Sequence, residues 1–247
     1  MSDQMLYVLL TGLGATMDRM TATTNNLANT NTVAFKAQQP MFQALPLYGQ
    51  GLPDRVDVAA QEQAANFTQG PLQQTGRDLD IAVKGQGWIG VQAKDGSIAL
   101  TRNGSLTVSA TGVLETSDGH PLVGQGGRPI VLPPMQSMTI GEDGTISGVL
   151  VGQDPSQIAA INRIMLTNPP SASVTRRGDG LFQSSASGGP ADAKVQVQAG
   201  ALEGSNADSV GLMMNMIENS RMYQMQTELM HTVVTFGQSQ STPLTLP

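Results

Sequence analysis

Apolar residues recur at alternating steps of three and four positions along residues 5 to 29. This is the spacing of a heptad seam, and it predicts a first helix over roughly Met5 to Asn29. The seam consists of Leu6, Leu10, Leu13, Met17, Met20, Thr24 and Leu27. Solvated helices normally carry a charged outer face, but between Gln4 and Phe35 the only charges are Asp18 and Arg19. We therefore expect this helix to be covered on most of its sides.

The other end of the chain carries the same stepping, with a second apolar register beside it. The first register is Met213, Met216, Ser220, Tyr223, Thr227, Met230 and Val234. The second register is Met222, Met225, Leu229 and Phe236. Ser205 and Asp208 predict the helix start, because their side chains can accept hydrogen bonds from free backbone N–H groups. Two apolar registers on a charge-poor helix favour a helix pair that packs against other copies. The alternative is a two-helix hairpin lying on the chain's own globular core.

Between these ends the pattern changes twice. Residues 35–75 have no clear period and are punctuated by proline and glycine, which predicts an extended connector. A period of two begins at Leu79, where Leu79, Ile81 and Val83 are expected to face a core while Asp78, Asp80 and Lys84 face water. Similar alternation at Ile98/Leu100, Leu106/Val108 and Met138/Ile140, with single strands at Ala160–Thr167 and Val195–Gln198, extends the β pattern. Asp-Gly and Asn-Gly pairs supply turns between strands.

The expected fold is mainly β with α-helical termini. Residues 1–34 and 205–247 form a discontinuous helical coiled-coil domain, 35–75 the connector, and 76–204 an inserted antiparallel β domain. Because the β region is inserted between two helices that meet, the chain termini are expected to lie together and the β domain outside.

Composition excludes several classes of protein. With 13% charged residues and a net charge of −6, the 247-residue chain lacks the basic surface of nucleic-acid-binding proteins. The absence of cysteine excludes disulfides, thiolate zinc sites and cysteine nucleophiles. No apolar run approaches the ~18 residues of a membrane span, so the protein is not expected to be membrane-embedded. The N-terminus lacks the basic region of a cleaved signal peptide.

One stretch imitates a nucleotide-binding motif. Residues 85–90 read Gly-Gln-Gly-Trp-Ile-Gly, but a dinucleotide site needs this loop to open a helix. Here the sequence continues as a strand, which indicates a glycine-rich hairpin. Asp78 and Asp80 share one strand face without a third polar residue, so we interpret them as solvated carboxylates.

The remaining candidates for chemistry are isolated. His120 precedes a proline in a turn and His231 lies within the C-terminal helix, which is not a metal-ligand spacing. Arg176 and Arg177 read as a solvated loop, and no serine nucleophile motif occurs. We expect no catalytic, metal or cofactor site and no small-molecule substrate.

Motifs along nearly the whole chain resemble the bacterial flagellar axial proteins, the family of rod, hook and hook-associated subunits. The N-terminal motif is Asn25, Asn26, Leu27, Ala28 and Asn29, followed by Phe35 and Lys36. The middle carries Gln69-Gly-Pro-Leu, Gly85-Gln-Gly-Trp and Thr101-Arg-Asn-Gly, and the C-terminal part carries Leu202-Glu-Gly-Ser-Asn and Arg221-Met-Tyr-Gln. Ala34 stands where the family usually has glycine, which puts the backbone geometry of that position in doubt.

The resemblance implies a non-enzymatic structural subunit of the flagellar basal body, most similar to proximal-rod members, with distal-rod or hook subunits as alternatives. It further implies export through the flagellar type III system into the periplasmic rod and partnership with itself and other rod subunits. The terminal helices would form the inner layer of the tube and the β domain the outer one. Two other classes, a secreted β-domain hydrolase and a self-contained β-rich binding module, remain as alternatives.

Overall fold

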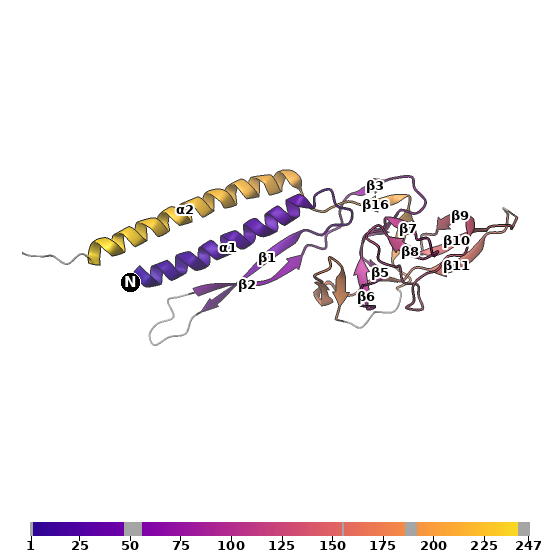
Figure 1. Cartoon of the computed structure of the whole chain (residues 1–247), viewed down its shortest axis with the longest axis horizontal. Coiled ribbons are helices and arrows are strands. Elements are labelled where there is room, and N and C mark those ends of the chain that lie inside the picture. The colour runs from indigo at the N-terminus through magenta and orange to yellow at the C-terminus, as the bar shows by residue number, and fades with distance from the viewer. Residues whose placement is uncertain (1, 47–55, 155, 186–191, 242–247) are drawn as a thin grey trace, which may run out of the picture. The chain divides into compact units, whose positions relative to one another are not determined.

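A computed structural model describes residues 2–46, 56–154, 156–185 and 192–241. The described parts are mainly β, with one long helix at each end, α1 (Ser2–Ala28) and α2 (Ser209–Ser241), which confirms the expected fold class (Figure 1). The chain divides into two compact units. The helical unit consists of Met1–Ala28, Gln38–Ala64 and Asp208–Pro247, and the β unit of Asn29–Ala37 and Ala65–Ala207.

These boundaries differ from the expected ones. Residues 34–36 belong to the β unit, because Ala34, Phe35 and Lys36 are all buried within it. The stretch expected as an extended connector contains a two-stranded hairpin of β1 (Gln38–Pro46) and β2 (Val56–Ala65). Strand β1 contacts α1, so most of this stretch is part of the helical unit. The pattern failed here because a two-stranded hairpin needs no regular apolar alternation when a helix covers it.

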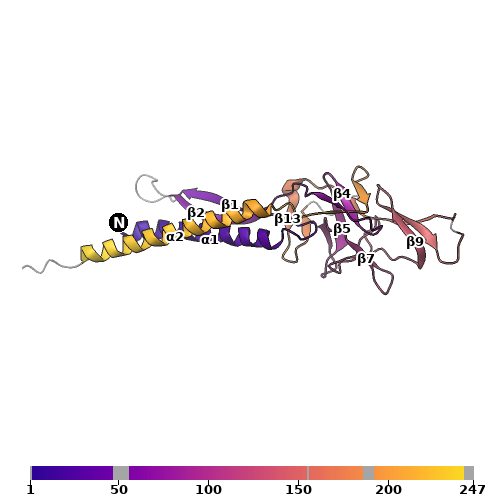
Figure 2. The same ribbon diagram turned by 90° about the horizontal axis from the view of Figure 1, so that it is seen from above.

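In the helical unit, α1 and α2 run side by side in opposite directions, as Figures 1 and 2 both show. Helix α2 begins at Ser209, about one turn after the start expected at Ser205. The two carboxylate oxygens of Asp208 accept hydrogen bonds from the backbone N–H groups of Val210 and Gly211, both at 3.2 Å. The Ser205 hydroxyl accepts a hydrogen bond from the Ala207 N–H instead, so Asp208 is the helix cap.

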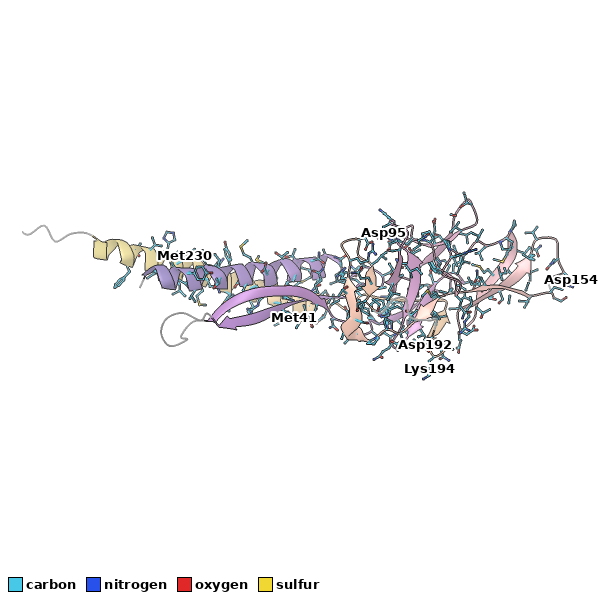
Figure 3. All side chains as sticks on the ribbon, turned by 90° about the horizontal axis from the view of Figure 1, so that it is seen from below. Met41, Asp95, Asp154, Asp192, Lys194 and Met230 are labelled. Carbon is cyan, nitrogen blue, oxygen red and sulfur yellow. The ribbon has the colours of Figure 1, made fainter. Side chains whose placement is uncertain are left out.

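The β unit is built from small antiparallel sheets. The largest has the strand order β12 (Leu166–Thr167), β5 (Trp88–Gln92), β6 (Ile98–Thr101), β14 (Phe182–Ser184) and β13 (Val174–Arg176). A second has the order β11 (Ala159–Arg163), β10 (Thr145–Leu150) and β9 (Met135–Ile140). The pairs are β15 (Gln196–Ala199) with β4 (Ile81–Lys84), β16 (Ala201–Glu203) with β3 (Leu72–Gln74), and β7 (Leu106–Val108) with β8 (Leu114–Thr116). Asp154 lies in the turn after β10 (Figure 3).

The alternation predicted from Leu79 onward is only partly correct. Ile81, Ala82 and Val83 are all fully buried, because β4 is covered on both of its faces. Leu79 packs against the core as expected, whereas Val108 is 45% exposed and lies outside it. The core itself gathers aliphatic side chains from most of the β unit, among them Ile81, Val83, Ile89, Leu106, Leu114, Leu122, Ile130, Ile146, Ile164 and Val197.

Asp80 was expected to face water, and that expectation is wrong. Its side chain is buried, and the Arg77 guanidinium and the Thr75 hydroxyl donate hydrogen bonds to its carboxylate. Asp78 is exposed as expected. The charge of Asp80 is tolerated inside because two donors replace its water.

Residues 85–87 form the turn between β4 and β5, and the chain continues from this turn as a strand and not as a helix, as expected. The two strands do not form a hairpin, because β4 pairs with β15 while β5 pairs with β6 and β12. Gly87 has φ 142°, and a Cβ there would collide with Val195. The strand expected over Ala160–Thr167 is divided into β11 and β12.

Candidate assembly surface

The contact between α1 and α2 uses small side chains of α1. Thr16 and Thr23 are buried, and Asn219 donates a hydrogen bond to the Thr23 hydroxyl at 3.4 Å. A Cβ added at Gly12 would lie 3.7 Å from Nε2 of Gln226, which is ordinary van der Waals contact. Small residues let two helices approach closely, so the large apolar residues of α1 are not needed between them.

A second face of α1 meets the β1–β2 hairpin. The Asn26 amide donates to the Gln38 carbonyl at 2.8 Å and accepts from the Gln38 N–H at 2.7 Å. Ala22, one turn earlier on the same side of the helix, is buried. Among the family-motif residues at this end, Asn26 therefore holds β1 against α1. Leu27 and Asn29 are half-buried, while Asn25 and Ala28 are exposed.

Three of the seven residues in the predicted seam of α1 lie on a third, open face. Leu10 is 48% exposed and Met17 is 53% exposed, and Thr24 is also exposed. The other four members, Leu6, Leu13, Met20 and Leu27, are half-buried. The seam is thus not the main contact between the two helices. Its most exposed members form an apolar surface that the chain's own described residues leave in contact with solvent.

Helix α2 shows the same division. One row of half-buried positions is spaced four and three apart: Leu212, Met216, Asn219, Tyr223, Gln226, Met230 and Val233. Ser220 and Thr227 of the predicted register are also half-buried, as are Ser209 and Gly211 at the start of the helix. Two residues of the row, Asn219 and Gln226, contact α1 directly, so this row faces α1. Met216, Tyr223 and Met230 of the predicted register belong to it, and Met230 can be located in Figure 3.

The remaining predicted apolar positions of α2 are exposed in the described chain. Met213 and Val234 are exposed, and so is the whole second register of Met222, Met225, Leu229 and Phe236. Val210, Met214 and Ile217 add to the same open side. Exposed apolar patches of this extent on a folded chain mark sites of interaction with other molecules.

Threonine makes the helix surfaces less polar than their composition indicates. Along α1, the hydroxyls of Thr16, Thr21, Thr23 and Thr24 each donate to the carbonyl four residues earlier, at 2.8–3.0 Å. Thr232 and Thr235 do the same in α2, at 3.0 Å. A threonine bonded in this way has satisfied its donor within its own helix. Such a face can be covered by an apolar partner without leaving an unpaired hydroxyl donor.

The second half of the N-terminal motif lies in the β unit, beside the C-terminal motif. Ala34 has φ 58°, the only positive φ of a non-glycine residue in the described ranges. Its N–H donates to the Glu203 carbonyl at 2.8 Å. Phe35 is buried, with the Arg176 guanidinium 5.1 Å from its ring centre. The sequence therefore identified a backbone position that normally calls for glycine, and Ala34 occupies it.

Three charged residues meet in the interior at this point. Lys36 Nζ lies 2.6 Å from Oε1 of Glu203, and one terminal nitrogen of Arg102 lies 2.9 Å from Oε2. The side chains of Lys36 and Glu203 are 0% exposed and that of Arg102 is 4% exposed. We call these three residues the Glu203 cluster. Burial lowers the pKa of Lys36, and its hydrogen bond to Glu203 opposes this shift.

Sequence reasoning identified Lys36 as a motif residue but did not connect it with Arg102 and Glu203. The signal was present: each residue stands inside one of the quoted motifs, in a chain with few charges. Arg176 and Arg177 were expected in a solvated loop, and for Arg176 this is wrong. Arg176 ends β13 and lies over Phe35 and Phe182, and burial lowers its pKa.

Arg177 is part of an ion pair at the surface. Its guanidinium donates to the Asp95 carboxylate at 2.7 Å. Hydrogen bonds from the Ser97 hydroxyl, from Arg177 and from the Ser97 N–H hold the pKa of Asp95 well below its usual 3.8. Because Asp95 is exposed, this pair is not a candidate active site.

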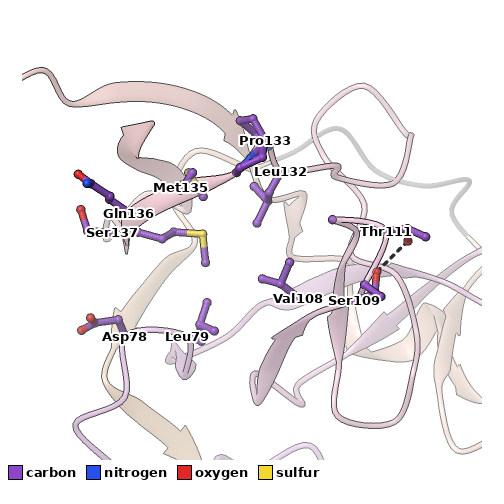
Figure 4. A pocket seen from close by; sticks show the side chains of 14 residues that line it. Asp78, Leu79, Val108, Ser109, Thr111, Leu132, Pro133, Met135, Gln136 and Ser137 are labelled. Carbon is purple, nitrogen blue, oxygen red and sulfur yellow. Dashed lines mark hydrogen bonds between the residues drawn. The ribbon is translucent and has the colours of Figure 1, made fainter. Parts of the chain in front are cut away.

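The β unit also contains an open pocket of about 720 Å³ (Figure 4). It lies between the turn after β7 and strand β9, and Leu79, Val108 and Met135 contribute apolar side chains. Asp78 is the one ionisable residue in its lining. His120 is buried elsewhere in the β unit and His231 is exposed on α2. Within the described ranges, no group of three or more His, Asp or Glu residues is placed to hold a metal ion. Neither described helix is both long and apolar enough to cross a bilayer.

Comparison with known proteins gives consistent matches over nearly the whole chain. A family model described as the flagellar hook protein FlgE/F/G D1 domain matches residues 82–148, and one described as the flagellar basal body rod FlgEFG protein C-terminal matches residues 198–234. The flagellar basal-body rod protein FlgF of Escherichia coli K12 is 38% identical, with 94% of each chain covered. FlgF of Salmonella typhimurium is 37% identical over the same shares. The rod protein FlgG of Agrobacterium fabrum is 31% identical, covering 92% of this chain and 94% of the relative.

Proposed function

The chain belongs to the family of flagellar basal-body rod proteins, and we propose that it polymerises into the rod through the open apolar faces of α1 and α2. The observation that carries the proposal is that the residues of the contact between α1 and α2 differ from the large apolar residues that remain exposed. Small residues such as Gly12 and Thr23 make the contact between α1 and α2, while Leu10, Met17 and Met225 remain exposed.

Other subunits can cover these faces with a substantial gain. Fully burying one Leu, Met or Phe side chain stabilises by about 1.5–3 kcal/mol, so covering a half-exposed one contributes roughly 1 kcal/mol. Summed over the open residues of both helices, this is enough to compensate a large part of the entropy lost on association. The back-bonded threonines lower the cost of covering the remaining positions.

The two open faces also suit an open-ended assembly. The face of α1 around Met17 and the face of α2 around Met225 differ in sequence and lie on different helices. Contacts between unlike faces do not close on themselves unless the rotation returns to the start, so they generate helical filaments. A rod is such a filament.

The finer assignment is to the proximal rod. It is supported by the higher identity to FlgF, 38% for the E. coli protein, than to FlgG, 31% for the A. fabrum protein. A distal-rod position is the alternative. On this assignment the subunit is a non-enzymatic part of the periplasmic drive shaft and export channel. It is exported by the flagellar type III system, it takes other rod subunits as partners, and its β unit faces outward.

Cysteine labelling tests the proposal, because the chain has no cysteine of its own. Leu10→Cys and Met225→Cys each place a single thiol on one open face. In the purified monomer both thiols should react with a maleimide dye, since both parent side chains are about half exposed. In isolated basal bodies both should be protected, and unfolding the same basal bodies in denaturant, as the control, should restore full labelling. Equal labelling of the monomer and the native basal body would overturn the proposal.

A further inference from the structure

The Glu203 cluster connects four segments that are far apart in sequence. Besides Lys36, the carboxylate of Glu203 accepts a hydrogen bond from the backbone N–H of Gly70 at 2.9 Å. Lys36 Nζ donates in turn to the carbonyl of Thr68 at 2.8 Å. Arg102 reaches the Gly85 carbonyl at 2.7 Å with its other terminal nitrogen. One carboxylate thus fixes the segments around residues 36, 70, 102 and 203.

The segments around residues 36 and 203 are joined again at Asn206, three residues after Glu203. The N–H of Ala37 donates to the Asn206 side-chain oxygen at 2.7 Å, and the Asn206 N–H donates to the Phe35 carbonyl at 3.3 Å. The Asn206 amide also donates to the Asn66 carbonyl at 2.8 Å. Within the β unit, Ala34 and Lys36 are therefore bonded to Glu203, and Phe35 and Ala37 are bonded to Asn206. Along the chain, residues 34–37 follow α1 and residues 203–206 precede Asp208, the cap of α2.

An arrangement of this kind contributes little net stability. Two cations and one carboxylate lose their water here, and Nε of Arg102 has no hydrogen-bond partner among the described residues. Removing charges from water costs about as much as their attraction returns, so well-packed apolar residues of similar volume are often as stabilising. The charges do, however, favour one alignment of the two segments over others. A slip of either segment by one residue would leave at least one buried charge unpaired, whereas an apolar contact would tolerate the slip.

We propose that the Glu203 cluster is a positioning device: it fixes which residues of segment 34–37 pair with which residues of segment 203–206, and so sets the register of the two chain ends from which α1 and α2 extend. Its contribution is to the uniqueness of this pairing and not to the overall stability of the β unit. The consequence for assembly rests on the proposed function, because only subunits with one register present their open helix faces alike to the next subunit.

The local backbone supports this role. Ala34, in the left-handed backbone conformation, donates a hydrogen bond from its N–H to the Glu203 carbonyl. The main chain of Glu203 is therefore bonded to the same segment as its side chain. A side chain at Gly70 would collide with the backbone of Gly204, which keeps the third segment within reach of the carboxylate. Because side chain and main chain both specify the pairing, neither segment can shift alone.

The test uses two full-length variants and a matched control. Glu203→Gln removes the anion and leaves two buried cations. The triple variant Lys36→Met, Arg102→Met, Glu203→Leu removes all three charges and keeps their volume. The control, Lys84→Met with Glu142→Leu, makes the same kind of change in an ion pair of similar length, 2.9 Å, that is exposed. Each protein is melted, and each is expressed in cells that lack the native subunit to count intact basal bodies by electron microscopy.

The expected results separate pairing from stability. Glu203→Gln should melt at least ~5 °C below the native protein, because it leaves unpaired buried charge. The triple variant leaves the buried Gly70 N–H without its acceptor, so it should melt slightly below the native temperature, within ~5 °C of it and above Glu203→Gln. It should nevertheless form fewer than about one tenth as many basal bodies. In its monomer, hydrogen exchange of the Ala34 and Ala37 amides should speed up about tenfold. The control should match the native protein in every readout.

Two outcomes would overturn the inference. A triple variant that melts far below the native protein would show that the cluster is a stabiliser, and one that melts and assembles like the native protein would show that register does not depend on it. Failure of the proposed function has a different signature, since cysteines at positions 10 and 225 would then label equally in monomer and basal body. The triple variant can assemble normally while those cysteines remain protected, and in that case only the positioning role fails.

Discussion

Ala34 gives a prediction whose size can be worked out from the structure. At φ 58° its Cβ stands in the left-handed region, which costs an L-residue about 1–2 kcal/mol. Ala34→Gly removes this strain. The substitution also destabilises the protein in two ways. It raises the entropy of the unfolded chain, which costs roughly 0.5–1 kcal/mol, and it removes a buried methyl group, which costs about 0.8 kcal/mol. These effects nearly cancel, so the glycine variant should keep the native melting temperature within ~3 °C.

Ala34→Val adds to the strain. A branched Cβ is an outlier at positive φ, and the site is buried, so the two extra methyl groups add an overpacking cost of about 1–3 kcal/mol. The total loss is about 2–4 kcal/mol, which lowers the melting temperature by roughly 5–15 °C for a chain of this size. Ala37→Val is the matched control, because Ala37 lies in the same segment, is half-buried and has no positive φ.

The assay is thermal unfolding of the purified proteins by circular dichroism, with swimming motility of complemented cells as the second readout. Ala34→Gly should support native motility and Ala34→Val should impair it. If Ala34→Val melts together with the native protein and with Ala37→Val, the left-handed backbone at this position is not a constraint and the reasoning is refuted.

Three further outcomes follow from the burial and charge of particular residues. Val83→Asp places an unpaired charge in the core of the β unit and should lower the melting temperature by about 10 °C, whereas Val108→Asp, at a half-exposed position, should change it by less than ~2 °C; equal shifts would contradict the described core. The folded-state pKa of Asp95 lies below its unfolded value, so the ionised carboxylate stabilises the folded protein above pH ~4 and this stabilisation is lost on acidification. The difference in melting temperature between the native protein and Asp95→Asn should therefore be visible at pH 7 and shrink below pH 3.8. A difference that grows on acidification would contradict this prediction. Trypsin should cut the dilute monomer at Arg19 before Arg102, because the helix pair buries mainly small side chains while Arg102 is inside the β unit. The order of cleavage is read by mass spectrometry. Cleavage at Arg102 first would show that the helices are the more stable part.

Local patterns in the sequence were informative about the helices. The apolar registers predicted both helices and the exposed row through Met225, and the pair Ser205 and Asp208 located the start of α2 to within about one turn. The resemblance also singled out position 34 as a glycine position, and Ala34 has a positive φ. These features depend on neighbours within one or two turns of helix, or on a single backbone angle, so a linear sequence contains them.

The features that sequence reasoning missed depend on distant partners. Asp80 looked solvated because its burial requires Arg77 and Thr75 to fold over it. Glu203 gave no sign of its pairing with Lys36, 167 positions earlier, because nothing in a local pattern measures that separation. The face of α1 that contacts α2 was also missed, since small residues such as Gly12 and Thr23 carry no hydrophobic signal. Each miss therefore lies at a contact between remote segments.

The central claim, that rod subunits meet through the open faces of the helices, is tested most directly by one charge on each face. Leu10→Lys and Met225→Lys replace side chains that are about half exposed in the single chain, so the melting temperature of either monomer should stay within ~2 °C of the native value. In the assembly the same lysine would be buried without a partner in every copy, at a cost of several kcal/mol each. Leu10→Met and Met225→Leu are the volume-matched controls. The measurement is the number of intact basal bodies isolated from cells in which each variant replaces the native subunit. We predict native numbers for the two controls and none for either lysine variant. Normal basal bodies from both lysine variants would contradict the account.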